Sequence, residues 1–290
     1  MQQVTDPEEV RAEDPRLADY RHLTDAAARR AVEGSDGDGI LIAEGVLALR
    51  QLLRSSYRVR SILSTPSRAE AVRAELRSAE LDGSASAEAT AHLVAPRALL
   101  ESITGYDVHR GVLAAADPGV PRDPEEVLAG ARRVVVAEGI SDHENLGALF
   151  RNAAALGLDA VILDDRCADP LYRRSIRVSS GWALRMAFAR AGSAGGLVER
   201  IERHGLRPVA LTPAPGALPV DRAAAEGVLD DPVALLVGAE GPGLSPAVLE
   251  ACATWVAVPM AGEVDSLNVA TSLAVVASFA AARRSWGLKE

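Results

Sequence analysis

The sequence predicts an α/β protein with two domains, the second of which carries a mostly parallel sheet. Beyond residue 130, short apolar runs typical of strands alternate with longer segments that have apolar residues at helical spacing. Such alternation is typical of parallel strands joined by helical crossovers. Prolines and a glycine cluster at 118–124, where they predict a domain boundary. We expect an N-terminal extension over 1–20, a first domain over 21–116, a linker over 117–130 and a second domain over 131–290.

The individual elements follow from the same patterns. Residues 44–53 place Val46, Leu49 and Leu53 on one face of a predicted helix, and residues 59–63 form an apolar run typical of a strand. In the second domain the pattern predicts strands at 133–137, 160–163, 208–212 and 233–237, and helices at 146–156, 197–204 and 267–283. Because no internal repeat relates these segments, the sequence leaves the order of the strands open.

Composition excludes several classes of protein. Of the 290 residues, 48% are apolar, which is normal for a soluble globular chain. The first fourteen residues are acidic and lack the apolar region of a signal peptide, so we expect a cytoplasmic protein. The uncharged stretch 266–282 is too short and too polar for a membrane span, and it predicts a buried helix and no membrane partner.

The lysine content, the cysteine positions and the net charge exclude further classes of functional site. Lys289 is the only lysine, so the chain has no P-loop lysine and no Schiff-base lysine. Cys167 and Cys252 are isolated, which predicts neither a disulfide framework nor a metal site. A net charge of −9 argues against indiscriminate binding to polyanions. Two acid-free stretches carry arginines, over 50–68 and 173–190, and these could form basic surfaces or solvated helix faces.

Three segments of the second domain lie where a predicted strand meets a helix, and open α/β sheets bind ligands at such ends. In the first, residues 138–152, a polar loop leads into a helix for which Asn145 is a suitable N-cap, and Arg151 lies on its second turn. In the second, residues 236–246, a strand runs into a turn with Gly238, Gly241 and Gly243. Glycines there let backbone groups approach a ligand closely.

The third segment, residues 258–269, joins the end of a strand to the long apolar helix. Ser266 and Asn268 stand at the start of that helix, where both residue types are common as caps. Alone, each of the three segments has an ordinary structural explanation: a surface arginine, a tight turn or a helix cap. Their joint occurrence carries the functional interpretation.

Together, the three segments resemble the signature motifs of the SpoU/TrmH family of SPOUT RNA methyltransferases. The family motifs are N-x-G-x-x-x-R, G-x-E-G-x-G-L and I/V-P-M-x-G-x-x-x-S-L-N-V, and they occur here in the same order, over roughly 132–284. Residues 169–181 resemble the family's segment between the first two motifs. Residues 42–46 and 105–114 are similar, more loosely, to the family's substrate-binding domain, whose fold is like that of kink-turn-binding ribosomal proteins. His109-Arg110-Gly111 stands where H-P-Q-G is commoner.

The resemblance implies a second domain closed by a deep trefoil knot, and a homodimer. It also implies S-adenosylmethionine as methyl donor, S-adenosylhomocysteine as product, and no metal. The residues implied to hold the cofactor are Gly238, Glu240, Gly241, Gly243, Val258, Met260 and Leu267. The residues implied to be catalytic are Asn145, Arg151, Glu240, Ser266 and Asn268.

Methyl transfer from a sulfonium is a direct displacement, so the protein must place the acceptor oxygen in line with the methyl group. In the family, the arginine matching Arg151 is proposed to act on a ribose 2′-hydroxyl. Because arginine is effectively always protonated, we expect Arg151 to hold a phosphate and stabilise the developing oxyanion, and not to act as a base. The other residues implied to be catalytic would orient the ribose and the cofactor.

The expected function is S-adenosylmethionine-dependent methylation of a ribose 2′-hydroxyl in structured RNA. Ribosomal RNA is favoured over transfer RNA, because family members that modify transfer RNA typically have a shorter, helical N-terminal extension than this chain. Alternatives are a transfer RNA 2′-O-methyltransferase, a SPOUT enzyme that methylates a base nitrogen, and a non-catalytic RNA-binding or assembly factor. The candidate RNA contacts are Arg50, Arg54, Arg58, Arg60, Arg173 and Arg177.

Overall fold

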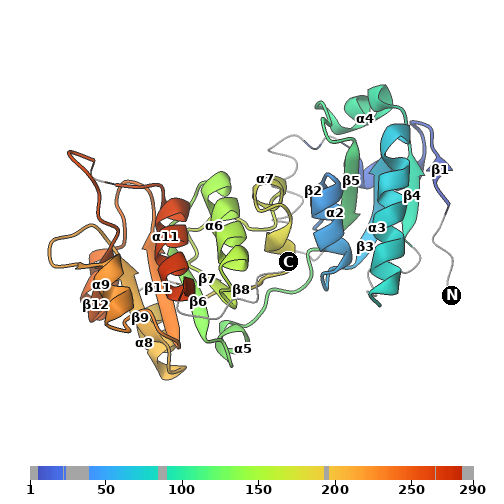
Figure 1. The fold of residues 1–290 in the computed structure, drawn as a ribbon. Helices are drawn as coiled ribbons and strands as arrows, with labels where there is room; N and C mark the ends of the chain where they lie inside the picture. Colours follow the sequence, from blue (N-terminus) through green and yellow to red (C-terminus); the bar gives the residue numbers. More distant parts are fainter. Residues whose placement is uncertain are drawn as a thin grey trace. The chain divides into compact units, whose positions relative to one another are not determined.

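A computed structural model describes residues 6–21, 23, 39–83, 90–192, 196–264 and 266–282 of the chain. Contacts divide it into two compact units, the first of residues 1–120 with 169–185 and the second of residues 121–168 with 186–290. Figure 1 labels the main elements of both units. Residues 169–185 group with the first unit, although their position in the sequence lies within the range expected for the second domain.

The first unit is built on a mixed sheet whose described strands follow the order β1-β4-β3-β5-β2. Parallel pairing joins β1, β4 and β3, whereas β5 pairs antiparallel with β3 and β2. The strands are β1 (Glu8–Glu9), β2 (Leu41–Glu44), β3 (Val59–Ser64), β4 (Ala91–Val94) and β5 (Val112–Ala116). The helices are η1 (Pro15–Tyr20), α2 (Val46–Leu53), η2 (Pro66–Arg68), α3 (Ala69–Leu81), α4 (Arg97–Thr104), α7 (Arg173–Val178) and η4 (Trp182–Leu184).

The N-terminal segment belongs to the core of this unit. β1 extends the sheet beside β4, and Leu17 and Tyr20 of η1 are fully buried. The Tyr20 hydroxyl donates a hydrogen bond to the carbonyl oxygen of Ser61 at 2.8 Å, and burial raises the pKa of this phenol. Residues 6–20, which we expected as part of an extension, therefore contribute a strand to the sheet and buried side chains to the core of the first unit. Residues 1–5 lie outside the described residues.

The second unit is built on an all-parallel sheet. Its described strands follow the order β10-β12-β9-β11-β6-β7-β8. The strands are β6 (Arg133–Glu138), β7 (Ala160–Leu163), β8 (Ala187–Arg190), β9 (Arg207–Leu211), β10 (Leu218–Pro219), β11 (Val233–Gly238) and β12 (Thr254–Ala257). The helices are α5 (Pro124–Leu128), α6 (His143–Ala155), α8 (Leu197–Arg203), α9 (Val220–Ala225), α10 (Pro246–Ala251) and α11 (Val269–Ala282). The α/β class with a parallel sheet is confirmed.

Helices cover both faces of this sheet. One apolar cluster packs α5, α8 and α10 against alternate residues of the central strands, among them Val134 and Val136 of β6 and Ala234 and Leu236 of β11. Residues between these point to the opposite face, where α6 and α11 lie side by side and contact β7 and β11 (Figure 1). Burial on both faces explains why β6, β7 and β11 have uninterrupted apolar sequences.

The strand order places a ligand-binding position at the centre of the sheet. The chain leaves β6 toward β7 and β8 on one side, and it leaves β11 toward β12 on the other side. The neighbouring strands β6 and β11 therefore form a switch point, and ligands of open α/β sheets bind at the C-terminal ends of strands beside such a point.

The predicted strands at 133–137, 160–163, 208–212 and 233–237 are confirmed within one residue as β6, β7, β9 and β11. The predicted helix at 146–156 begins three residues earlier, at His143, because Asp142 and not Asn145 is its N-cap. The Asp142 carboxylate accepts hydrogen bonds from the backbone N–H groups of Glu144 and Asn145 at 2.9 and 2.8 Å. Arg151 consequently lies on the third turn of α6, not the second.

The long apolar helix α11 is buried along one face only. Leu273, Val276 and Ala277 are buried, whereas Thr271 and Ser278 are exposed and Phe279 is 37% exposed. The expected buried helix is therefore buried on one face and exposed on the other. Arg283, the expected last residue, lies outside the described part of the chain. Within that part, no helix has the length and apolar character that would let it cross a membrane.

Candidate functional site

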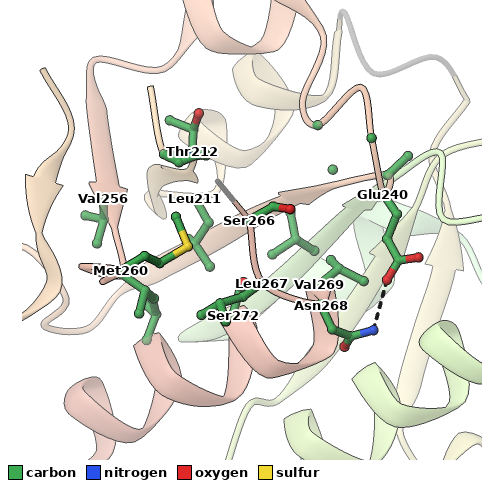
Figure 2. Close-up of a pocket in the computed structure, with 18 residues that line it drawn as sticks. Leu211, Thr212, Glu240, Val256, Met260, Ser266, Leu267, Asn268, Val269 and Ser272 are labelled. Atoms are coloured by element: carbon green, nitrogen blue, oxygen red, sulfur yellow. Dashed lines mark hydrogen bonds between the residues drawn. The ribbon is translucent and has the colours of Figure 1, made fainter. Parts of the chain in front are cut away.

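A cavity of about 560 Å³ lies in the second unit, at the C-terminal ends of β9, β11 and β12 (Figure 2). This volume is in the range of small-molecule sites, roughly 300 to 1,000 Å³. All seven residues expected to hold the cofactor line it, as do Ser266 and Asn268. The described lining residues are Leu211, Thr212, Pro213, Val237, Gly238, Ala239, Glu240, Gly241, Gly243, Val256, Val258, Met260, Ser266, Leu267, Asn268, Val269, Ser272 and Val276.

The glycine-rich turn after β11 forms one wall of the cavity. The backbone N–H of Gly243 donates to the carbonyl oxygen of Ala239 at 3.0 Å, so the turn closes back on the end of the strand. A Cβ atom on Gly238 would lie 2.1 Å from the carbonyl carbon of Gly243, which excludes every side chain at this position. Gly241 and Gly243 have φ angles of +88° and +71°, which side chains disfavour.

Asn268 connects three separate segments at the edge of the cavity. Its Nδ2 donates to Oδ1 of Asn145 at 2.7 Å and to Oε1 of Glu240 at 2.9 Å; Figure 2 shows the contact with Glu240. Its Oδ1 accepts from the backbone N–H groups of Ala270 and Thr271, at 3.0 and 3.2 Å, and so caps α11. Because Oδ1 is held by the cap, Nδ2 must face Asn145 and Glu240.

The remaining candidate catalytic residues are placed differently. Ser266 is exposed and lines the cavity beside Leu267, which is 39% exposed; Asp265 of the same motif lies outside the described residues. Arg151 is exposed on α6, the helix that carries Asn145, but it is not part of the cavity wall. No hydrogen bond or ion pair joins its guanidinium to any described residue. The site therefore groups Asn145, Glu240, Ser266 and Asn268, and leaves Arg151 exposed to solvent.

Residues 132–278, which contain all three motifs, match the sequence model of the SpoU rRNA methylase family. The chain belongs to this family. It is 40% identical over 275 residues to an uncharacterized tRNA/rRNA methyltransferase of Mycobacterium tuberculosis, an alignment that covers 95% of this chain and 90% of that protein. The protein is thus a SpoU-family RNA methyltransferase.

Solved structures agree in fold with this SpoU methylase over nearly its whole length. An RNA 2′-O ribose methyltransferase superimposes with a TM-score of 0.71 at 27% identity, covering 94% of this chain and 97% of the other. An AdoMet-bound rRNA methyltransferase from Sinorhizobium meliloti superimposes with a TM-score of 0.70 at 21% identity, covering 95% of this chain and 98% of the other. Both likenesses therefore include the first unit as well as the methylase motifs.

Sequence reasoning missed a buried carboxylate that anchors the glycine turn of this methylase. Glu138, at the end of β6, is 3% exposed; its Oε2 accepts from the backbone N–H of Ser245 at 2.8 Å. Its Oε1 pairs with Nη2 of Arg166 at 2.8 Å, and Nε of Arg166 donates to Asp164 at 2.9 Å. Burial alone raises the pKa of Asp164, but hydrogen bonds from Gly139 and Arg166 lower it below its ordinary value overall. The only indication in the sequence was an acidic residue at the end of the apolar segment that forms β6.

The end of β9 was also missed. Leu211 and Thr212 line one side of the cavity (Figure 2). Ser272 and Val276 of the long apolar helix also line it. The available signal was that 208–212 is a third predicted strand whose C-terminal end had no motif assigned. Because the sequence does not order the strands, nothing placed this end beside those of β11 and β12.

The four candidate RNA contacts between residues 50 and 60 are already paired with acids. Each of these arginines meets a carboxylate from a distant part of the chain within 2.7 Å, so its charge is largely compensated. These four arginines of the acid-free stretch therefore do not form an unopposed basic surface. The pairs are Arg50 with Glu75, Arg54 with Asp82, and Arg58 and Arg60 with Asp117.

The two candidate RNA contacts on α7 lie in the first unit. The Arg173 guanidinium stands 4.4 Å from the ring centroid of Tyr106, in the range of a cation–π contact. Arg177 is half-buried on the next turn, and its charge contributes to the electrostatic surroundings of Tyr106. Both arginines therefore lie near the loop that follows α4.

The donor set of the described residues contains no group of three His, Cys, Asp or Glu side chains placed to hold a metal ion. Burial raises the pKa of the Cys167 thiol to about 12 and that of Cys252 to about 11. Both thiols are therefore protonated at neutral pH, and neither has the thiolate character of a nucleophile.

Proposed function

We propose that this SpoU methylase transfers a methyl group from S-adenosylmethionine to a ribose 2′-hydroxyl of structured RNA, with ribosomal RNA as the favoured substrate. The observation that carries the proposal is the junction of Asn145, Glu240 and Asn268 at the edge of the cavity. Likeness at 27% identity to an RNA 2′-O ribose methyltransferase supports the ribose as acceptor.

The cavity suits S-adenosylmethionine. Its apolar wall, which includes Val258, Met260 and Leu267, can cover an adenine ring, while the turn around Gly241 offers backbone groups. Glu240 is the only charged residue among the described lining residues, and its carboxylate favours a cationic cofactor. When bound, S-adenosylmethionine supplies an electrophilic methyl group and leaves as S-adenosylhomocysteine. The AdoMet-bound protein of the same fold supports this assignment.

The chain's own residues then have two tasks. Asn268, fixed by its backbone cap, holds Glu240 and Asn145 in place, and we assign this group and Ser266 to orienting the ribose beside the cavity. Arg151 is exposed and always protonated, so it can bind an RNA phosphate and stabilise negative charge that develops on the attacking oxygen. The second unit thus holds the cofactor, and the first unit contributes to RNA binding.

Substitution of Arg151 tests this assignment. Arg151→Ala should lower methyl transfer by about a hundredfold or more, as loss of a charge-stabilising group does, while affinity for S-adenosylmethionine in calorimetry changes little. Arg222→Ala is the matched control, because Arg222 is an exposed arginine of the same unit that pairs with Glu226. A large loss of cofactor binding in folded Arg151→Ala would refute the assignment to the RNA side.

The acceptor is tested by mapping methylated nucleotides in RNA from cells with and without the gene. We expect one 2′-O-methyl mark in ribosomal RNA to disappear with the gene. Loss of a base methylation would overturn the ribose as acceptor, and loss of a mark in transfer RNA only would overturn ribosomal RNA as substrate. If no RNA methylation changes although the protein binds S-adenosylmethionine, the proposed RNA methyl transfer is overturned.

A further inference from the structure

We propose that RNA phosphates bind the first unit at a loop edge formed by Arg68 and Arg110, and not at the arginines of α2 and the start of β3. The inference rests on the proposed RNA substrate and deepens it by assigning the contact surface. Arg68 lies in the acid-free stretch 50–68, and Arg110 lies in the segment 105–114 that resembles the family's substrate-binding domain, but neither is among the six candidate RNA contacts expected from the sequence.

Arg68 and Arg110 differ from the paired arginines in their surroundings. Both are exposed, and no hydrogen bond or ion pair joins either guanidinium to a residue that the structure describes. By contrast, the Arg58 side chain is 78% exposed, yet its guanidinium lies 2.6 Å from the Asp117 carboxylate. A guanidinium that already holds a carboxylate must give up that partner before it can bind a phosphate, whereas Arg68 and Arg110 have no such partner among the described residues.

Two glycines bring the side chains of Arg68 and Arg110 to the same place. A Cβ on Gly45 would lie 2.7 Å from Cδ of Arg110, and a Cβ on Gly111 would lie 3.2 Å from Cγ of Arg68. The arginine stems therefore lie over glycine backbone, at positions with φ of +93° and +63°. Since Gly111 directly follows Arg110, the stems of both arginines lie against neighbouring backbone of the same loop edge.

Backbone hydrogen bonds hold the three loops of this edge together. The N–H of Thr65 donates to the carbonyl oxygen of Gly111 at 2.9 Å, and the N–H of Gly45 donates to that of Val112 at 2.9 Å. The loops after β2 and β3 and the loop before β5 are thereby tied to one another. Such a fixed edge positions its cations before any ligand arrives, which lowers the cost of binding.

Sheet geometry separates this edge from the acid that neutralises Arg58 and Arg60. These two arginines stand at the start of β3 and Arg68 follows its end; β3 has six residues, a length of about 20 Å. Because β5 runs antiparallel to β3, Arg110 precedes β5 at the same edge as Arg68, while Asp117 follows β5 at the other. Charges this far apart are largely screened at physiological salt, where the Debye length is about 8 Å.

Asp107, an acid close to the edge, already has positive partners. Asp107 of the same loop is bridged by Arg97 at 2.6 Å and by His109 at 2.9 Å. Arg173, over the Tyr106 ring, and Arg177 lie on α7, which contacts β2.

The chemistry of the patch fits the phosphates of folded RNA. Arginine presents a planar fork of donors that matches phosphate oxygens, and contacts to phosphates position folded RNA without reading its bases. A few such contacts are compatible with a chain of net charge −9, since the cations are gathered on one edge. The patch therefore orients RNA on the first unit, while Arg151 acts at the reaction site.

The test compares the full-length double variant Arg68→Ala/Arg110→Ala with wild type for binding to deproteinised total RNA at several salt concentrations. We expect affinity to fall about tenfold or more, and the slope of log affinity against log salt to become shallower by about 1 to 2. Arg68→Lys/Arg110→Lys should keep most of the affinity and the slope. Affinity for S-adenosylmethionine and the melting temperature should stay near those of wild type.

Arg16→Ala/Arg77→Ala is the matched control, because both arginines are exposed in the first unit and both pair with acids. Wild-type affinity and salt slope in the folded Arg68→Ala/Arg110→Ala variant would overturn the inference, as would an equal loss in the control. If wild type methylates RNA while the double variant binds it unchanged, the loop-edge assignment alone fails. If wild type neither binds nor methylates RNA, the proposed function fails as well.

Discussion

Asn268 has two separable duties, and its chemistry allows them to be told apart. Its carbonyl oxygen caps α11, and its amide nitrogen donates to Asn145 and Glu240. An aspartate can accept the same backbone hydrogen bonds but has no proton to donate, and its charge would repel Glu240. The two duties therefore respond differently to substitution.

Asn268→Asp should keep a melting temperature near that of wild type while losing most methyl transfer, because the cap survives and the junction does not. Asn268→Ala should lose both, with a stability cost of about 0.5 to 2 kcal/mol for the missing cap. Thermal unfolding and single-turnover methyl transfer measure the two effects. Full activity in the aspartate variant would show that donation from Asn268 is dispensable.

Gly238 and Gly241 are required for different reasons. Gly238→Ala would push a Cβ to 2.1 Å from the backbone of Gly243, so we expect the turn to open and cofactor binding to be lost. At Gly241 the added Cβ meets no atom within 4 Å, and the cost is only the strain of φ +88°, about 1 to 2 kcal/mol. Calorimetry on both variants checks the contrast; equal cofactor affinity in the two would contradict it.

At the scale of elements, the pairing of β3 with β4 buries a histidine. His92 of β4 is fully buried and its Nε2 lies 2.8 Å from Oγ of Ser64 on β3. Nδ1 has no hydrogen-bond partner among the described residues. Burial, helped by the charge of Arg73, lowers the pKa of His92 from 6.5 to about 4.

This shift makes stability depend on pH. Below pH 6.5 the unfolded chain protonates His92 while the folded chain does not until about pH 4, so the His92 contribution is complete above pH 6.5 and is lost on acidification. The stability difference between wild type and His92→Gln should change by up to about 1.4 kcal/mol per pH unit in that window. Urea unfolding at pH 7.5, 6.0 and 5.0 measures it. A pH-independent difference would show that His92 is not buried neutral.

At the scale of the whole molecule, the two units are not consecutive along the chain. Residues 169–185 pack with the first unit: α7 contacts β2, and Gly181 lies against α2, where a Cβ would meet Gln51 at 2.9 Å. Removing the first 120 residues would strip these contacts from the remaining segment. Point substitutions in the full chain are therefore the cleaner test of which unit binds RNA.

Self-association is also a property of the whole molecule. The outer face of α11 carries the partly exposed Phe279. We predict a homodimer, twice the 30.3 kDa of one chain, in light scattering. Phe279→Glu should shift it toward monomer, and Leu81→Glu, at a residue that is 88% exposed, is the control. A monomer mass at every concentration would contradict the prediction; the trefoil knot likewise stays a prediction.

The sequence by itself determined the α/β class, four of the seven described strands of the second unit's sheet within a residue, and nine of the eighteen described residues that line the cavity. These depend on local physics: strands buried on both faces need uninterrupted apolar runs, and turns that close back on a strand need glycine. The order of three motifs added the family. The cap of α6 was misassigned because Asp142 and Asn145 are both good caps, and only the observed backbone shows which one the helix begins from.

Only the tertiary structure decided which residues meet. Asn145 and Asn268 lie 123 positions apart, Arg58 and Asp117 lie 59 apart, and no local pattern links either pair. An acid-free stretch of sequence predicted a basic surface, but folding brought distant carboxylates to Arg50, Arg54, Arg58 and Arg60. Arg68 and Arg110 have no carboxylate partner in the part of the chain that the structure describes. The amino-acid sequence fixes how charges are spaced along the chain. Which charges meet on the surface depends on the strand order and register, because these bring remote segments together.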